Sequence, residues 1–318
     1  GGEFALTTGG GSSAVIAEDV SAKGIKGQAN VAIDSGSFTI DAADDAIHSN
    51  GNIVINDGSF VLLTGDDGIH ADATVTINGG EIDISQSWEG IESAVITIND
   101  GNISVVSSDD GINVAGGVDG SGMMAGPGRG GRGGPGGMPG SDSTTYTGNY
   151  YLYINGGTIF VDAAGDGLDA NGAIEMTGGL VIVNGPTEQM NGALDYDGTF
   201  NISGGTFIAA GSAGMAQAPG TGSTQNSVLI NLSGTLPGGT LMNLSNESGE
   251  SVMTFAPSKD IQSIIFSSPA LTNGEYTLYY GGSATGTETG GLYLDGTYTP
   301  GTEYTTFTVS SVTTIIGG

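Results

Sequence analysis

Acidic side chains recur at a regular interval along this chain, each time inside a short phrase that ends in an aliphatic and a polar residue. The phrase occurs as Asp44-Asp45-Ala46-Ile47-His48, Asp66-Asp67-Gly68-Ile69-His70, Trp88-Glu89-Gly90-Ile91-Glu92, Asp109-Asp110-Gly111-Ile112-Asn113 and Gly165-Asp166-Gly167-Leu168-Asp169. Its second position falls at residues 45, 67, 89 and 110, so the steps are 22, 22 and 21 residues. Extrapolation places Lys23 one step earlier and Glu188 one step beyond Asp166. A fixed period of this size is typical of a solenoid, in which each repeat forms one coil and equivalent residues stack.

Stacked coils would bring these carboxylates close enough together to need a cation. Neighbouring strands lie ~4.8 Å apart, and two unit charges ~5 Å apart repel by roughly 3 kcal/mol at an effective dielectric near 20. The chain has only five Lys and Arg residues, so we expect Ca²⁺, which binds about six to eight oxygen ligands, to offset the repulsion. Zinc fits less well because cysteine is absent and the two histidines stand alone among oxygen ligands.

The candidate metal ligands are the acidic residues of these phrases. They are Asp44, Asp45, Asp66, Asp67, Glu89, Glu92, Asp109, Asp110, Asp166 and Asp169. The alternative interpretation is a solvated acidic face in which the Asp-Gly pairs serve only as turn residues. A turn role does not require carboxylates in register between coils, so the regular spacing favours a metal.

The segments between the acidic phrases have the pattern of short β-strands. Residues 36–41 and 51–57 alternate apolar and polar side chains and are rich in β-branched types. Asn-Gly and Asp-Gly pairs such as Asp57-Gly58 and Asn78-Gly79 mark corners, because these residues tolerate positive φ. A coil of about 22 residues suits three short strands and three corners. The sequence therefore predicts an all-β chain, a parallel β-helix whose inward aliphatic residues form one continuous core.

Composition and charge exclude several classes of function. The formal net charge is −29, which argues against binding to nucleic acid and against attraction to an anionic membrane surface. No run of residues is long and apolar enough to span a bilayer, and the absence of cysteine excludes disulfides. The chain opens Gly1-Gly2-Glu3-Phe4 without Met, as a processed product would. We expect a mature extracellular or cell-surface protein of a bacterium, formed by removal of a targeting segment.

The repeat pattern divides the chain into two parts. Residues 1–226 are predicted to form the parallel β-helix, with an N-terminal cap over 1–17 and a Gly/Pro-rich loop inserted at 120–145. Residues 227–318 contain alternating segments without the period and are predicted to form a C-terminal β-strand cap domain. A cap is expected because the end of a solenoid is an open sheet edge.

The coils and the C-terminal segment together resemble a known family. The Asp-Asp-Gly-Ile-His/Asn phrase, Phe255-Ala256-Pro257-Ser258-Lys259 and Tyr276-Thr277-Leu278-Tyr279-Tyr280-Gly281-Gly282 are similar to bacterial carbohydrate-binding proteins with a pectate-lyase-like right-handed β-helix. The resemblance implies right-handed coiling, calcium sites, and binding of cellulose or polygalacturonate. By residue it implies calcium ligands among Asp44, Asp45, Asp66, Asp67, Asp109, Asp110 and Asp166. The coils that carry Lys23 or Trp88-Glu89 depart from the aspartate pair.

Three functions remain open at the level of sequence. A non-catalytic binder of polysaccharide is favoured, with the candidate sugar-stacking residues Trp88, Tyr150, Tyr151 and Tyr153, although the tyrosines also suit packing on a sheet face. A self-assembling extracellular filament is the second, with a homopolymer formed through β edges and residues 3–8 as a candidate donated strand. A calcium-dependent polysaccharide lyase is the third. Catalysis is disfavoured because the lyases that the chain resembles use a basic residue, commonly arginine, and Arg129 and Arg132 lie in the Gly/Pro-rich loop.

Overall fold

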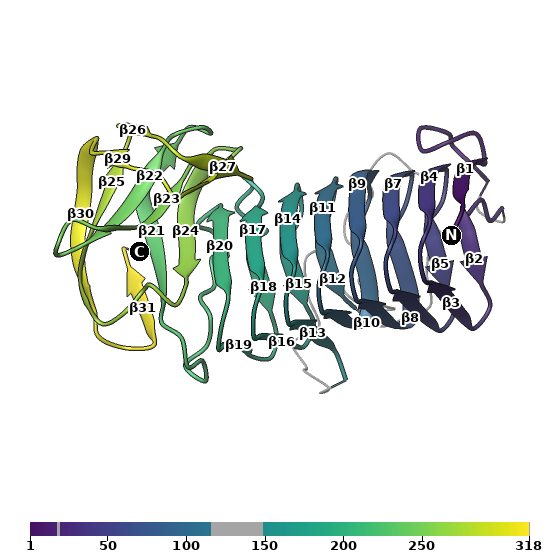
Figure 1. Ribbon diagram of the computed structural model, residues 1–318, viewed down its shortest axis with the longest axis horizontal. Helices are drawn as coiled ribbons and strands as arrows, with labels where there is room; N and C mark the ends of the chain where they lie inside the picture. The colour runs from purple at the N-terminus through teal and green to yellow at the C-terminus, as the bar shows by residue number, and fades with distance from the viewer. Residues whose placement is uncertain (18–19, 116–148, 318) are drawn as a thin grey trace.

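The computed structural model describes residues 1–17, 20–115 and 149–317, and these ranges contain strands and turns but no helix (Figure 1). The prediction of a parallel β-helix is confirmed: the chain winds through about seven parallel turns, followed by antiparallel sheets. Most of the predicted Gly/Pro-rich loop, with Arg129 and Arg132, lies outside the described residues. No helix among the described residues is long and apolar enough to cross a membrane.

One face of the solenoid is sheet A, in which eight parallel strands follow one another in chain order. These strands are β1 (Glu3–Thr8), β4 (Ser37–Ala42), β7 (Ser59–Thr64), β9 (Glu81–Ser87), β11 (Asn102–Ser107), β14 (Thr158–Ala163), β17 (Leu180–Asn184) and β20 (Thr206–Gly211). Residues 3–8, expected in an irregular cap, form the regular edge strand β1. Phe4 and Leu6 pair in register with Phe38 and Ile40 of β4, so the ladder already begins at residue 3.

The rest of each turn lies in sheet B, which has two parts. The first part contains β2 (Ile25–Gly27), β5 (Ile47–Ser49), β12 (Ile112–Val114), β15 (Leu168–Ala170) and β18 (Leu194–Tyr196). The second contains β3 (Asn30–Ile33), β6 (Asn52–Ile55), β13 (Tyr151–Ile154), β16 (Ala173–Met176) and β19 (Phe200–Ile202). The longer strands β8 (Ile69–Ile77) and β10 (Ile91–Ile98) run through both parts.

Inward side chains of successive turns stack into a single apolar core. Ile47, Ile69, Ile91 and Ile112 pair in register from turn to turn, and all four are fully buried. Alternation along each strand sends every second residue inward, as the sequence pattern predicted. On the sheet A side, stacked rings of Phe4, Phe38 and Phe60 have centroids 4.9 Å apart at both steps.

A column of amide side chains lines the corner that leads into sheet A. We call it the asparagine ladder; it consists of Asp34, Asn56, Asn78, Asn99, Asn155 and Thr177. Asn78 Nδ2 donates to Asn56 Oδ1 at 2.8 Å, and Asn99 Nδ2 donates to Asn78 Oδ1 at 2.8 Å. Each amide both accepts and donates, so the column satisfies itself from turn to turn.

The last turn is longer than the period predicts. Leu194 pairs with Leu168, a step of 26 residues, and Gly192 takes the position expected for Glu188. Glu188 lies exposed in the extra residues of this turn. The extrapolation fails because the stacking of Leu194 and Asp195 on Leu168 and Asp169, rather than residue count, sets the register.

The C-terminal region both extends sheet A and adds a second sheet. Its strands are β21 (Ser227–Leu236), β22 (Met242–Asn246), β23 (Ser251–Phe255), β24 (Ile261–Ser267), β25 (Gly274–Tyr280), β26 (Ser283–Ala284), β27 (Thr287–Thr289), β28 (Leu292–Leu294), β29 (Tyr298–Thr299), β30 (Thr302–Val309) and β31 (Thr313–Ile316). β24 pairs antiparallel with β20, and β21 and β31 continue sheet A beyond it. A six-stranded antiparallel sheet, β27-β28-β23-β22-β25-β30, packs as the second layer at this end (Figure 1).

Candidate functional site

The acidic phrases form one aligned feature, which we call the carboxylate column. Its members are Asp45, Asp67, Glu89, Asp110 and Asp166, with Lys23 at the N-terminal end. Each lies two residues before the stacked aliphatic ladder. The corner hydrogen bonds keep the same register: Ala46 N donates to the Asp67 carbonyl and Gly68 N to the Glu89 carbonyl.

Glycine in the phrase lets each acidic corner pack closely against the core. A Cβ placed on Gly90 would lie 2.2 Å from Val105 Cγ1, and one on Gly111 would lie 2.2 Å from Val161 Cγ1. A larger residue would push the corner away from sheet A and move the neighbouring carboxylate out of line. The glycines thus hold the acidic side chains in the column.

The first turn provides its own cation. Lys23 Nζ lies 2.9 Å from Asp44 Oδ1 and 2.6 Å from Asp45 Oδ2, and the Lys23 side chain is only 5% exposed. The Ala22 amide also donates to Asp44 Oδ2 at 3.0 Å. A lysine ammonium therefore occupies the place beside this aspartate pair.

Two histidines stack beside the next turns and reach into the column. The rings of His48 and His70 have centroids 5.1 Å apart, and His48 Nδ1 lies 2.8 Å from Asp45 Oδ2. His70 Nδ1 lies 3.0 Å from Asp67 Oδ2 and 2.7 Å from Glu92 Oε2. Burial lowers the pKa of His70, but hydrogen bonds to these two carboxylates outweigh it and raise the pKa to about 12. His70 is thus a second internal cation.

The middle of the column is the most crowded with negative charge. Oxygens of Asp67, Glu89 and Glu92 all lie within 4.8 Å of one another. Burial raises the pKa of Asp67 well above its ordinary value, and Asp45, Asp66 and Glu92 raise it further while the His70 hydrogen bond opposes the shift. Burial likewise raises the pKa of Glu89, with Glu92 as the largest of the charged contributions. An added positive charge would stabilise the ionised forms of both.

Other candidate residues gather into similar groups. Ligand atoms of Asp44, Asp45 and Asp66 lie within 4.8 Å of one another, as do those of Asp110, Asp166 and Asp169, and those of Asp45, Asp67 and His70. Asp109 joins none of these groups in the described part of the chain, and burial raises its pKa. Of the ten predicted ligands, the structure thus brings nine into groups of three.

These groups suit Ca²⁺ by donor type and by size. Calcium binds oxygen ligands at about 2.3–2.6 Å, so two ligands on opposite sides of the ion lie up to ~5 Å apart. Three of the four groups consist of carboxylate oxygens alone, and the group that contains His70 does not. Asp67, Glu89 and Glu92, or Asp110, Asp166 and Asp169, would hold the ion as ligands from adjacent turns.

Sequence reasoning missed one acidic residue of this region. Asp195 is buried and pairs in register with Asp169, so it extends the acidic side of sheet B by one turn. The signal was present, because Leu194-Asp195 repeats Leu168-Asp169 after a small residue. The count of residues concealed it.

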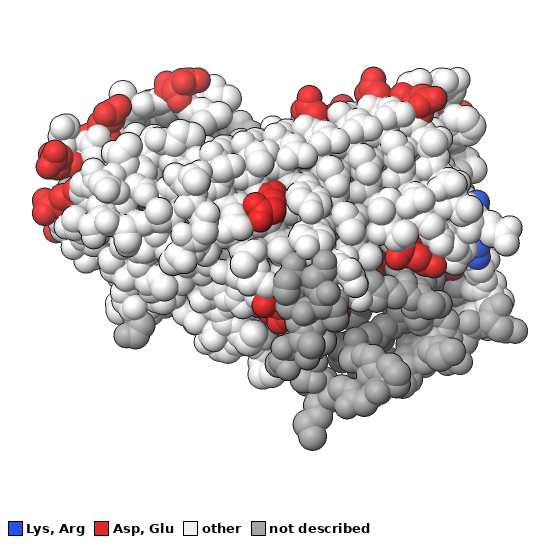
Figure 2. Space-filling model, turned by 90° about the horizontal axis from the view of Figure 1, so that it is seen from below, with Lys and Arg blue, Asp and Glu red and all other residues white. Residues whose placement is uncertain are grey.

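The predicted sugar-stacking residues do not form one site. Tyr151 and Tyr153 stack with ring centroids 5.4 Å apart on the outer face of β13, while Tyr150 packs partly against the core. Trp88 follows β9 at the corner after sheet A and is half-buried. The face seen in Figure 2 carries acidic side chains in separate groups on a largely uncharged surface.

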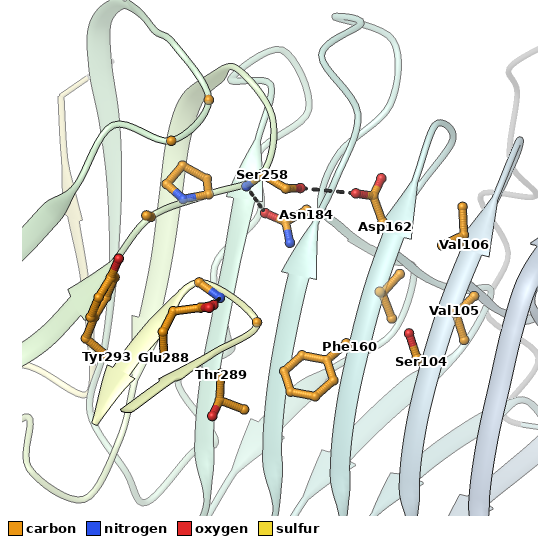
Figure 3. A pocket seen from close by; sticks show the side chains of 17 residues that line it. Ser104, Val105, Val106, Phe160, Asp162, Asn184, Ser258, Glu288, Thr289 and Tyr293 are labelled. Carbon is orange, nitrogen blue, oxygen red and sulfur yellow. Dashed lines mark hydrogen bonds between the residues drawn. The ribbon is translucent and has the colours of Figure 1, made fainter. Parts of the chain in front are cut away.

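A groove on the outer face of sheet A was not predicted. It has a volume of about 870 Å³ and lies between β11, β14 and β17 on one side and the cap hairpin β27–β28 on the other (Figure 3). Its lining includes Phe160, Asp162, Asn184, Glu288 and Tyr293. A smaller hollow of about 400 Å³, lined in part by Trp88, adjoins it, since Val106 lines both.

Lysines of the described residues are engaged rather than placed as free bases. Lys259 Nζ lies 2.8 Å from Asp162 Oδ1 and donates to the Ala163 carbonyl at 2.6 Å. Lys23 is held by the first aspartate pair. Lys26 is exposed and donates to Ser21 Oγ at 3.2 Å.

Comparison with known proteins gives one partial match. Residues 1–68 match a family model described as "Carbohydrate-binding domain-containing protein". This segment covers the first turns, including Lys23 and the first two aspartate pairs. No curated protein matches the chain, and no solved structure matches it.

Proposed function

We propose that this chain is a non-catalytic, calcium-binding β-solenoid that binds polysaccharide of the polygalacturonate or cellulose type outside a bacterial cell. The observation that carries the proposal is the group formed by Asp67, Glu89 and Glu92, with its crowded oxygens and raised pKa values. Calcium supplies the positive charge that this group needs, and it can also coordinate a carboxylate of a bound uronate.

Polysaccharide binding is supported by two independent features. The matched family model carries a carbohydrate-binding description over residues 1–68, which contain the first turns of the column. The solenoid also presents long sheet faces on which a linear polymer can lie. The two engaged lysines argue against proton abstraction by a free amine, so a binding role fits better than a lyase.

Affinity electrophoresis tests the proposal. The protein should be retarded in gels that contain polygalacturonate or cellulose derivatives, and EDTA should abolish the retardation by polygalacturonate. The same gels without polymer provide the control. Unretarded migration in both polymers with calcium present would refute the function.

A second candidate, a head-to-tail filament, is favoured by the polarity of sheet A. The sheet begins at β1 and ends at β31, and the pairings make these two edge strands run in the same direction. Phe4 is 47% exposed on β1 and Ile315 is 59% exposed on β31. Pairing of β31 with β1 of the next copy would continue one parallel sheet without closing, and such contacts build fibres.

Lysine substitutions at the edges test the filament. Ala5→Lys and Ile315→Lys should each abolish fibres in electron micrographs of concentrated protein, since edge lysines block strand addition. Thr39→Lys, on an exposed position of an interior strand, is the matched control and should leave fibres intact. Discrete particles for the unsubstituted protein would remove this candidate.

A further inference from the structure

The groove between sheet A and the cap hairpin has the construction of a ligand site. Gly290, at the turn of the hairpin, has φ of +57°, and a Cβ there would lie 2.3 Å from the Phe160 ring. The hairpin therefore rests directly on the solenoid face. Asn184 Oδ1 accepts the Ser258 amide at 2.8 Å, and Ser258 Oγ donates to Asp162 Oδ2 at 3.1 Å (Figure 3). These contacts fix the groove walls in place.

Its polar groups suit a ligand rich in hydroxyls. Because Asn184 Oδ1 accepts the backbone amide, its Nδ2 group is turned to the other side and can donate to a ligand. Glu288 is exposed, and one of its oxygens accepts the Gly291 amide. A carboxylate can accept further bonds from ligand hydroxyls.

Aromatic and apolar surfaces complete the lining. Glu288 and Tyr293 are cross-strand partners in the β27–β28 hairpin, so their side chains lie on the same face. Tyr293 and Phe160 are half-buried, and Val106 is 44% exposed on β11. A flat apolar surface beside convergent polar groups is the usual character of a small-ligand site.

The charge of the groove selects against an anionic ligand. Its lining includes two carboxylates, Asp162 and Glu288, and no Lys or Arg. Lys259 lies beside it but is bound to Asp162 and to the Ala163 carbonyl. An acidic polymer entering the groove would be repelled, while a neutral one would not.

We propose that this groove binds a neutral, ribbon-like β-1,4-glucan chain, which crosses the strands of sheet A from Tyr293 toward Trp88. The inference rests on the proposed polysaccharide-binding function and assigns its neutral substrate class to this groove. Continuity with the smaller hollow through Val106 provides a path along β11 and β9. The chain would run perpendicular to the strands, with sugar faces against the aromatic rings.

Calorimetric titration with cellohexaose in EDTA tests the assignment. We expect binding without calcium, a loss of about tenfold or more in affinity for Tyr293→Ala, since an aromatic contact contributes up to ~1.5 kcal/mol beyond its buried area, and no change for Tyr153→Ala on the opposite face. Hexagalacturonate in EDTA should bind more weakly than cellohexaose, and Glu288→Gln should narrow that difference. Circular dichroism of each variant confirms that it folds.

The outcomes separate this inference from the proposed function. Cellohexaose binding that Tyr293→Ala leaves unchanged, or that Tyr153→Ala reduces equally, would overturn the groove assignment. So would absence of cellohexaose binding in a protein that calcium still retains on polygalacturonate, or a preference for an α-glucan oligosaccharide. Failure to bind any polysaccharide, with or without calcium, would refute both.

Discussion

Two polar columns run along this solenoid, and they meet the same stacking problem in different ways. In the asparagine ladder each amide donates to the one before it, at 2.7 to 2.9 Å over four steps. In the carboxylate column the ionised side chains can only accept. The column therefore uses Lys23 at its first turn and His70 at its third, and the crowded group around Glu89 calls for a cation from outside. Amides stack by themselves, whereas carboxylates stack only with a counterion.

Removing the internal cation should have the largest effect. Lys23→Met leaves the buried Asp44 and Asp45 without the ammonium group that contacts them at 2.9 and 2.6 Å. Loss of one partner of a buried ion pair costs about 3–5 kcal/mol, so the free energy of unfolding in EDTA should fall by that amount. Denaturant titration measures it. Lys26→Met, at an exposed position, is the matched control, and an equal loss in both variants would contradict the role of Lys23.

Making the carboxylate column more like the asparagine ladder should give an effect that reverses with calcium. Glu89→Gln removes a charge next to Asp67 and Glu92, so in EDTA the midpoint of thermal unfolding should rise or stay level. In calcium the same variant loses a ligand, and the stabilisation by the ion should shrink. Differential scanning calorimetry in both buffers checks the prediction. A loss of stability of the same size in both buffers would indicate a packing role only.

The reverse exchange should have the smallest effect. Asn78→Asp replaces the amide that donates to Asn56 with a group that cannot donate, and leaves only the bond accepted from Asn99. The lost hydrogen bond is worth about 1 kcal/mol, and the position is exposed, so we expect a decrease of that order in denaturant titration. Asn102→Asp, at an exposed position outside the ladder, should change stability less. Equal effects would show that the ladder contributes nothing.

Spacing predicted the column and the fold because a solenoid converts sequence period directly into register. The stacking of Ile47, Ile69 and Ile91 follows from two steps of 22 residues. The rule failed at the last turn, where the extra residues before Leu194 lengthen the corner.

The groove could not be predicted in this way. Phe160 and Tyr293 are far apart in the sequence, and no period relates the cap hairpin to the solenoid. Their proximity depends on how the second sheet packs against the last turns, which is a tertiary effect. The same is true of the close contact between Gly290 and the Phe160 ring.

Calcium binding by the carboxylate column is the central claim, and thermal unfolding with and without the ion tests it most directly. Protein dialysed against EDTA should unfold at a markedly lower temperature than the same protein in millimolar CaCl₂, while MgCl₂ at equal concentration should restore little. Identical unfolding temperatures in all three buffers, with no calcium retained after gel filtration, would contradict the account.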